Sequence, residues 1–178
     1  MKAPHLDSPD FALRLVEQND VNDWYAYLSL PHVVEHTSWD LRGPDDLRAL
    51  IGSYNQPGKP SPLRFAVCET SSGRFVGTFG LNSISPETRS AELAYDLHPS
   101  YWGRGLGSAC AEAVVHWANT SLGYPRTWAL VLDTNLPSAR LLQSIGFVPE
   151  RQLPAYRIVR GEPRDFWLYG RDASPAGV

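Results

Sequence analysis

The sequence predicts a single α/β domain in which strands and helices are intermixed along 178 residues. Residues 91–118 carry the clearest signal, because their composition is that of a strand, a glycine-rich loop and an amphipathic helix in succession. Two strand-like segments joined by a short turn precede this unit, which indicates a meander of three antiparallel strands. After it, the near-continuous apolar segment 127–132 is typical of a strand buried on both faces.

The first half of the chain predicts one strand, two helices and the start of the meander. Asp20 is placed to cap a helix that Pro31 stops, and Pro44 opens the next helix with Asp45 and Asp46 in its first turn. In chain order, we expect a strand at 11–16, a helix from 20 through 28, an irregular segment at 31–43, a helix from 44 to 51 or 54, a flexible loop at 55–62, and strands at 63–69, 74–81 and 91–97.

The second half predicts a long helix, a strand, a short helix and further strands. From Leu106 the apolar residues recur at i, i+3, i+4 and i+7, which places them on one face of a helix. Asn135 precedes a short helix, and Gly146 is placed to end that helix at its C′ position. A final strand is expected at 164–170.

Length and composition bound the class of protein. We expect a flexible N-terminal arm at 1–10, one domain at 11–171 and a disordered tail at 172–178. The formal net charge of −3 and the absence of a basic run argue against nucleic acid as a partner. No apolar run reaches the length of a membrane span and no signal peptide is recognisable, so we expect a cytoplasmic protein. Cys68 and Cys110 fall on apolar faces and are expected to be buried free thiols.

The glycine-rich loop predicts a binding site for a phosphate group. Gly103, Gly105 and Gly107 lie between strand and helix, where a backbone without Cβ atoms approaches a ligand closely, and Arg104 adds a charge. The first N–H groups of a helix lack partners and attract anions. A turn that binds nothing, a dinucleotide site and a pyrophosphate cradle of the acyl-CoA type stay open. The dinucleotide fingerprint fails at Ser108, and a P-loop is excluded because no Gly-Lys-Ser/Thr follows.

The same loop resembles the acetyl-CoA motif Arg/Gln-x-x-Gly-x-Gly/Ala of the GNAT superfamily of N-acetyltransferases. It stands here as Arg104-Gly105-Leu106-Gly107-Ser108-Ala109, preceded by Tyr101-Trp102-Gly103. A second family element, an Asn followed by a short helix that ends in Gly-Phe, runs here from Asn135 to Phe147. The chain looks most like the RimJ/RimL branch of ribosomal-protein N-terminal acetyltransferases, which favours a Glu at the position of Glu92. The resemblance spans about residues 10–171.

This resemblance implies a mixed, mostly antiparallel, twisted sheet that is splayed between its fourth and fifth strands and flanked by helices. It also implies acetyl-CoA as a cosubstrate in that gap, with the pyrophosphate at the helix start and the pantetheine arm along strand backbone. The residues that we expect to bind acetyl-CoA are Leu97, His98, Pro99, Arg104, Gly105, Leu106, Gly107, Ser108, Ala109, Asn135 and Ser138.

The implied reaction is direct transfer of an acetyl group from the thioester to an amine. Glu92 is the candidate base, acting through a water, and its alternative role is an ordinary strand carboxylate. Many relatives place a Tyr seven residues after the Asn, but Leu142 stands there. Ser138 is therefore the candidate proton donor to the thiolate, with a first-turn helix residue as its alternative role. Asn135 holds pantetheine or a water, caps the helix, or does both.

The acceptor is less defined than the cofactor. The expected acceptor wall is the loop 31–43 with His32, His36 and Trp39, or a loop at 152–165 with Tyr156 and Arg157. A protein N-terminus and a small-molecule amine both stay open as acceptors, as does a homodimer. A non-catalytic acyl-CoA-binding protein is the alternative function, and a nicotinamide-dependent oxidoreductase is the third. We expect no metal, because the histidines lack other ligands at suitable spacing.

Overall fold

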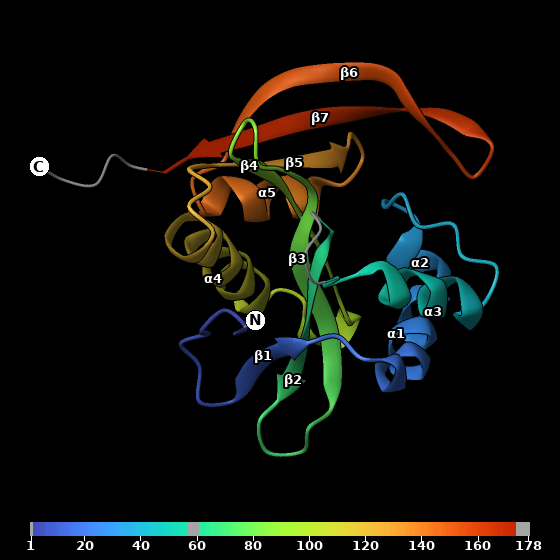
Figure 1. Ribbon diagram of the computed structural model, residues 1–178. Coiled ribbons are helices and arrows are strands. Elements are labelled where there is room, and N and C mark those ends of the chain that lie inside the picture. The colour runs from blue at the N-terminus through green and yellow to red at the C-terminus, as the bar shows by residue number, and fades with distance from the viewer. Residues whose placement is uncertain (1, 57–60, 174–178) are drawn as a thin grey trace, which may run out of the picture.

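The computed structural model describes residues 2–56 and 61–173 (Figure 1). One sheet of seven strands has the order β1-β2-β3-β4-β5-β7-β6. The strands are β1 (Phe11–Leu15), β2 (Leu63–Glu69), β3 (Phe75–Ser85), β4 (Ser90–Leu97), β5 (Arg126–Leu132), β6 (Val148–Val159) and β7 (Glu162–Asp172). The helices are α1 (Val21–Leu28), α2 (Pro31–Val34), α3 (Pro44–Ser53), α4 (Leu106–Ser121) and α5 (Leu136–Ser144), with short 3-10 turns at Gln18–Asp20 and Pro99–Tyr101.

The sheet is antiparallel except at its centre, where it opens. β4 and β5 pair in parallel over only three positions, from Ser90–Arg126 to Glu92–Trp128. They run parallel because α4 carries the chain back across the sheet between them. Beyond Glu92, β4 continues to Leu97 alongside β3 but without β5. The splay predicted between the fourth and fifth strands is therefore confirmed, and Glu92 stands at the last paired position before it.

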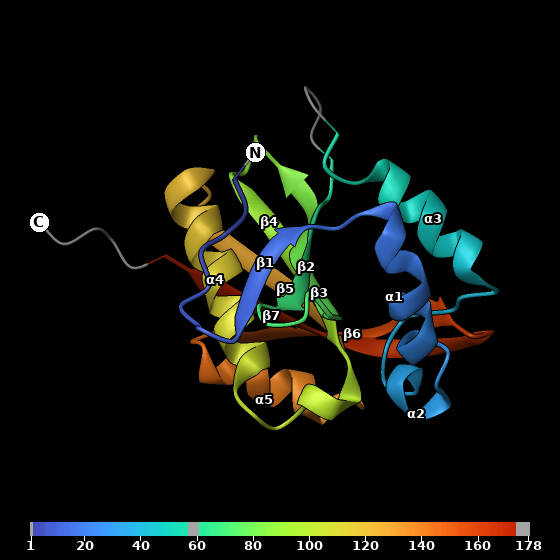
Figure 2. The same ribbon diagram turned by 90° about the horizontal axis from the view of Figure 1, so that it is seen from below.

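Helices cover both faces of the opened sheet. In Figures 1 and 2, α4 and α5 lie on one side, and α1, α2 and α3 lie on the other. Phe65 packs its ring edge against Trp117 of α4, with ring centroids 5.3 Å apart, in the core on the α4 side. Trp24 and Tyr27 of α1 are buried on the opposite side. Among the helices of the described residues, none is both long and apolar enough to cross a membrane.

Three expectations about the ends and loops are corrected. Leu6 is 7% exposed and packs in the main core, so the segment before β1 is held by that contact. Asp172 belongs to β7, so the tail predicted at 172–178 starts too early. The rest of that tail from residue 174 lies outside the described residues, as do residues 57–60 of the loop predicted at 55–62. The segment 152–165 is no loop but a hairpin of β6 and β7.

Smaller expectations are confirmed or refined. Cys68 and Cys110 are buried and free, as predicted. Gly146 follows the end of α5 with a φ of 84°, the left-handed conformation expected of a C′ glycine. Asp20 does not cap α1 with its side chain. Its carboxylate instead accepts hydrogen bonds from the Glu17 backbone N–H at 2.8 Å and from Arg14.

Candidate active site

The backbone of β4 supplies hydrogen-bonding groups to the gap. The His98 N–H donates to the Val76 carbonyl at 2.8 Å across the β3–β4 pair. Since bonding direction alternates along an antiparallel strand, the peptide groups of Leu97 and Tyr95 point away from β3, toward the space that β5 has left. An extended, amide-rich ligand can pair with them as an added strand would. The Leu97 carbonyl also accepts from Trp102 Nε1 at 2.7 Å and keeps one lone pair.

The start of α4 forms the anion-binding end of the same gap. Gly105 precedes the helix with a φ of 79°, and a Cβ there meets no atom within 4 Å. The Ala109 N–H donates to the Gly105 carbonyl at 3.1 Å, so the N–H groups of 105–108 are the ones without an intrahelical acceptor. A cavity of about 470 Å³ runs past this turn and is also lined by Arg140 of α5. The helix dipole, the open N–H groups and this guanidinium suit a pyrophosphate.

The structure brings part of the predicted cofactor set together. The cavity is lined by Leu97, Gly105, Gly107, Ser108, Asn135 and Ser138. The remaining predicted residues do not line it. Leu106 is buried in the core, and Ala109 is exposed on α4. Arg104 is exposed, with its guanidinium 6.0 Å from the Tyr101 ring centroid, and His98 and Pro99 form the turn before the loop. Pro137 and Arg140 are cavity residues that the sequence analysis did not single out.

Placing a branched side chain at Gly107 is expected to weaken acetyl-CoA binding. A Cβ at this position lies 2.8 Å from Leu141 Cδ1, within the wall of the cavity. We expect Gly107→Val to raise the Kd for acetyl-CoA by about tenfold or more, measured by isothermal titration calorimetry. Gly52→Val on α3, where a Cβ meets no atom within 4 Å, is the matched control. An unchanged Kd for Gly107→Val would place the phosphate group elsewhere.

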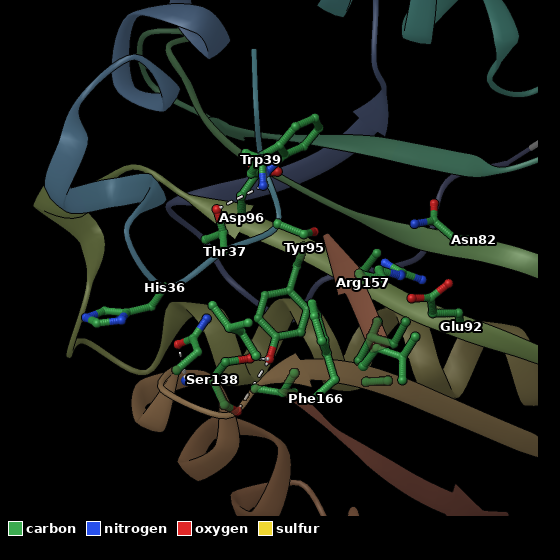
Figure 3. Close-up of a pocket in the computed structure, with 18 of the residues that line it drawn as sticks. His36, Thr37, Trp39, Asn82, Glu92, Tyr95, Asp96, Ser138, Arg157 and Phe166 are labelled. Carbon is green, nitrogen blue, oxygen red and sulfur yellow. Dashed lines mark hydrogen bonds between the residues drawn. The ribbon is translucent and has the colours of Figure 1, made fainter. Parts of the chain in front are cut away.

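A second cavity, of about 350 Å³, lies between the hairpin of β6 and β7 and the elements on the α1 side of the sheet (Figure 3). Glu92 lines it and is 7% exposed. Its Oε2 accepts a hydrogen bond from Ser83 Oγ at 2.9 Å, and no described residue donates to its Oε1. His36 and Trp39 of the predicted acceptor wall line this cavity, whereas His32 lines the cavity of about 470 Å³ at the start of α4. We name the two cavities after the ligands expected in them: the acceptor cavity, which Glu92 lines, and the cofactor cavity at the start of α4.

The two cavities meet at a shared wall. It is made of His36, Thr37, Tyr95, Asp96, Asn135 and Ser138. Tyr95 Oη and Ser138 Oγ are 2.7 Å apart and hydrogen-bonded across the gap between β4 and α5. Burial raises the pKa of Tyr95, so its hydroxyl stays protonated at neutral pH. Tyr95 was missed in the sequence because alternation places it on the face opposite Glu92, and that face reaches the site only because β5 stops pairing with β4 after Glu92.

Asn135 and Leu142 each settle one alternative left by the sequence. Asn135 Oδ1 accepts from the Ser138 N–H at 3.1 Å, so the helix-cap role is present while the residue also lines both cavities. No described residue accepts a hydrogen bond from its side-chain amide. Leu142 is fully buried in the core, and its neighbour Leu141 faces the cofactor cavity instead. Position 142 therefore offers no proton donor here.

Asp96 is a half-buried carboxyl that sequence analysis did not assign to the site. Its Oδ1 accepts from Trp24 Nε1 at 2.9 Å and from the Tyr27 hydroxyl, and its Oδ2 accepts from Thr78 Oγ1 at 3.0 Å. Burial raises the pKa of Asp96 above its usual value in spite of these donors and of nearby Arg64. The carboxyl joins α1 to β4 within the shared wall of the cavities.

The raised pKa of Asp96 predicts a pH-dependent stability. A carboxyl whose pKa is higher in the folded state than in the unfolded state stabilises the fold at low pH. For Asp96 this contribution is fully present below the unfolded pKa of 3.8 and is lost as the pH rises through the pKa of the folded state. Asp96→Asn keeps an acceptor oxygen but does not titrate. We therefore expect the free energy of unfolding of Asp96→Asn, relative to wild type, to rise from about pH 4 to about pH 7 in urea denaturation. Exposed Asp133→Asn is the control, and parallel curves for Asp96→Asn and wild type would contradict the assignment.

One border of the acceptor cavity is formed by contacts between two distant segments. Arg160, at the turn of the β6–β7 hairpin, donates to the carbonyls of Glu35 at 3.0 Å, Thr37 at 3.1 Å and Trp39 at 2.8 Å. His36 Nδ1 lies 3.2 Å from Thr134 Oγ1 on the β5 side. Figures 1 and 2 show the hairpin extending from the β5 half of the sheet toward α2. The segment 35–39 and the hairpin are thus joined across the cavity.

Comparisons with known proteins agree with this geometry. The sequence profile of the family described as "Acetyltransferase (GNAT) domain" matches residues 10–148. The chain is 31% identical over 170 residues to the uncharacterized N-acetyltransferase YoaA of Bacillus subtilis (strain 168), covering 93% of this chain and 95% of that relative. It is 29% identical over 161 residues to the uncharacterized N-acetyltransferase p20 of Bacillus licheniformis, covering 88% and 89%.

Solved structures share the fold. The spermidine N-acetyltransferase from Vibrio cholerae, in complex with CoA and spermine, superposes with a TM-score of 0.80 at 19% identity, covering 93% of this chain and 96% of that chain. The ribosomal-protein-S5-alanine acetyltransferase from Vibrio fischeri superposes with a TM-score of 0.75 at 18% identity, covering 93% and 94%. The fold of this chain is therefore shared by acetyltransferases that are named for different acceptors.

Proposed function

Because this chain belongs to the acetyltransferase (GNAT) family, we propose that its two cavities hold acetyl-CoA and a primary amine, which react at the wall they share. The chain is an acetyl-CoA-dependent N-acetyltransferase. The observation that carries the proposal is the junction itself, where the Tyr95–Ser138 hydroxyl pair faces both cavities and Glu92 lines the acceptor side. Acetyl-CoA supplies the activated acyl group, and the residues supply position and proton transfer.

Glu92 is the proposed base. An α-amine has a pKa near 7.7–8.0 and a lysine amine near 10.4, so a bound amine must lose a proton before it attacks. Oε1 of Glu92 faces the cavity with no described donor, while Ser83 holds Oε2 at 2.9 Å and fixes the carboxylate. The amine proton passes to Glu92 through a water, and the nitrogen lone pair forms the new C–N bond to the acetyl carbon.

The Tyr95–Ser138 pair is the proposed proton donor on the cofactor side. As the C–N bond forms, the C–S bond breaks and its electron pair stays on sulfur. Tyr95, kept protonated by burial, donates to Ser138 Oγ at 2.7 Å, and this leaves the Ser138 hydrogen directed to the sulfur. The thiol product then carries one proton from this pair, and Glu92 carries the first proton of the amine. The nitrogen of the new C–N bond loses its second proton to water as the amide forms, and exchange with solvent restores Glu92 and the hydroxyl pair.

The acceptor is proposed to be a protein N-terminus or a small-molecule amine, with the RimJ/RimL-like branch as the family assignment. Support comes from the Glu on β4 and the Ser at the start of α5, which the resemblance associates with that branch. The cavity on the Glu92 side has about 350 Å³, which suits one small molecule or the first residues of a peptide.

Thiol release from acetyl-CoA tests this function. The full chain is assayed against polyamines, amino acids, other small amines and N-terminal peptides, with acetyl-CoA binding measured in parallel. The proposal expects release that depends on one acceptor class and saturates with its concentration. Tight binding with no release on any acceptor would support a non-catalytic acyl-CoA-binding protein, and no binding would overturn the proposal.

A further inference from the structure

We infer that the acceptor carries a carboxylate beside its amine, as an amino acid does, and that Arg157 binds this carboxylate. This inference rests on the proposed function, because it concerns the acceptor cavity of the same site. Arg157 of β6 and Glu92 of β4 line that cavity together, one with a guanidinium and one with the proposed base (Figure 3). A zwitterion of amino-acid size places its two charged groups against them.

The Arg157 guanidinium is held by aromatic rings and has an unused hydrogen-bonding edge. Its Cζ lies 5.3 Å from the ring centroid of Tyr156 and 5.6 Å from that of Phe166. The two rings lie edge to face, 5.8 Å apart, and Phe166 also lines the cavity. No described residue accepts a hydrogen bond from this guanidinium. Contacts on the face of a guanidinium leave its in-plane N–H groups for a carboxylate, which can bind two of them at once.

The other charges of the cavity are balanced and leave room for a zwitterion. Arg64 is 3% exposed, and its guanidinium donates to the Ala94 carbonyl at 2.8 Å and to Asn82 Oδ1 at 3.0 Å, both uncharged oxygens. Its Nε is buried without a partner among the described residues. Of the two carboxyls in the lining, Asp96 is already bonded to three donors from the protein. The lining therefore holds two guanidinium groups, those of Arg64 and Arg157, with the carboxyls of Glu92 and Asp96, a balance that offers a polycation no excess of negative charge.

The size of the cavity, about 350 Å³, and the contacts at its border fit a small acceptor. The bonds from Arg160 to three backbone carbonyls tie the hairpin to the segment 35–39 above the cavity. The lining also has an apolar part, which includes Leu50, Leu130, Leu132 and Trp39. An amino acid with an apolar side chain satisfies all three surfaces: its amine meets Glu92, its carboxylate meets Arg157 and its side chain meets the apolar wall.

The test compares acceptors that differ only in the carboxylate. The full-length wild type is assayed with phenylalanine and phenethylamine, with leucine and isoamylamine, with spermidine and with a dipeptide. We expect kcat/KM for the amino acid of each pair to exceed that for its decarboxylated partner by about tenfold or more. Equal values within both pairs, or a preference for spermidine, would overturn the inference while leaving acetyl transfer intact.

Arg157 variants locate the effect. Arg157→Gln is expected to lower kcat/KM for the amino acid by about tenfold or more, mostly through KM, and to change that for the decarboxylated amine by less than about twofold. Arg157→Lys is expected to recover part of the loss, because it keeps the charge but not the paired N–H groups. Arg151→Gln, an exposed position on the same strand, is the matched control. An equal loss on both acceptors would make Arg157 a structural residue.

The design separates the two proposals. If no amine of any class is acetylated although acetyl-CoA binds, the proposed function fails. If amines without a carboxylate are acetylated at least as well as their partners, and Arg157→Gln does not discriminate between them, the proposed function stands and the carboxylate site is wrong.

Discussion

Glu92→Gln is expected to lower kcat by about hundredfold or more, because proton transfer by a positioned base contributes that much to such reactions. Glutamine keeps the shape of the side chain and an oxygen for the 2.9 Å hydrogen bond from Ser83, but it cannot take a proton. Acetyl-CoA binding is expected to stay the same, since Glu92 lines the acceptor cavity and not the cofactor cavity. Steady-state thiol release, with the Kd from calorimetry, measures both quantities.

The pH dependence separates a base from a structural carboxylate. In Glu92→Gln the amine must lose its proton to solvent, so kcat/KM is expected to rise with pH until it passes the pKa of the amine. The activity of the variant therefore approaches that of the wild type at high pH. Glu87→Gln, an exposed position in the β3–β4 turn, is the matched control. A kcat within about threefold of wild type would show that Glu92 is not the base.

Tyr95→Phe and Ser138→Ala are expected to act on the same step. Each removes one oxygen of the hydroxyl pair, and we expect each to lower kcat by about tenfold to hundredfold. Because the two hydroxyls are bonded to each other at 2.7 Å, the double variant is expected to be no slower than the slower single one. Initial rates at saturating acetyl-CoA, collected as a double-mutant cycle, give the coupling.

Folding controls accompany this cycle. Tyr25→Phe, on α1 and outside the lining of both cavities, is expected to keep full activity. The melting temperature of each variant shows whether a lost rate reflects lost structure. Independent effects that multiply in the double variant would mean that Tyr95 and Ser138 act on different steps.

The glycine-rich loop was predictable because local sequence determines it. Glycines at the junction of a strand and an amphipathic helix allow a tight turn, and Gly105 adopts the left-handed conformation there. Glu92 was expected from the family resemblance, and its role as the base stays a prediction. The alternation along β4 also correctly places Glu92 and Asp96 together, since both line the acceptor cavity.

Tyr95 and Asp96 were not predictable as site residues, because their roles depend on distant partners. Tyr95 reaches Ser138, 43 residues further along, only because the sheet has opened between β4 and β5. Asp96 is defined by Trp24 and Tyr27 of α1, which are brought to it by tertiary packing. No local pattern near either residue encodes these contacts.

The segment 152–165 was mistaken for a loop because the sequence of β6 lacks a strand pattern, whereas most of β7 was predicted as the strand 164–170. Nearly every residue of Val148–Val159 is exposed, so the apolar alternation of a half-buried strand is missing. Its pairing with β7 holds the segment in place.

The apolar residues of β5 serve the cavity as well as the core, since Ala129 and Leu130 line the acceptor cavity.

A single-turnover experiment tests the central claim, direct transfer between the two cavities, most directly. The chain is first incubated with acetyl-CoA alone, and intact-protein mass spectrometry records whether it gains an acetyl group; the preferred amine is then added and product formation is followed. We predict no acetylated protein before the amine arrives and acetylated amine together with one equivalent of thiol afterwards. Acetyl-protein that forms without amine and is consumed when amine is added would contradict direct attack at the wall of Tyr95, Ser138 and Asn135.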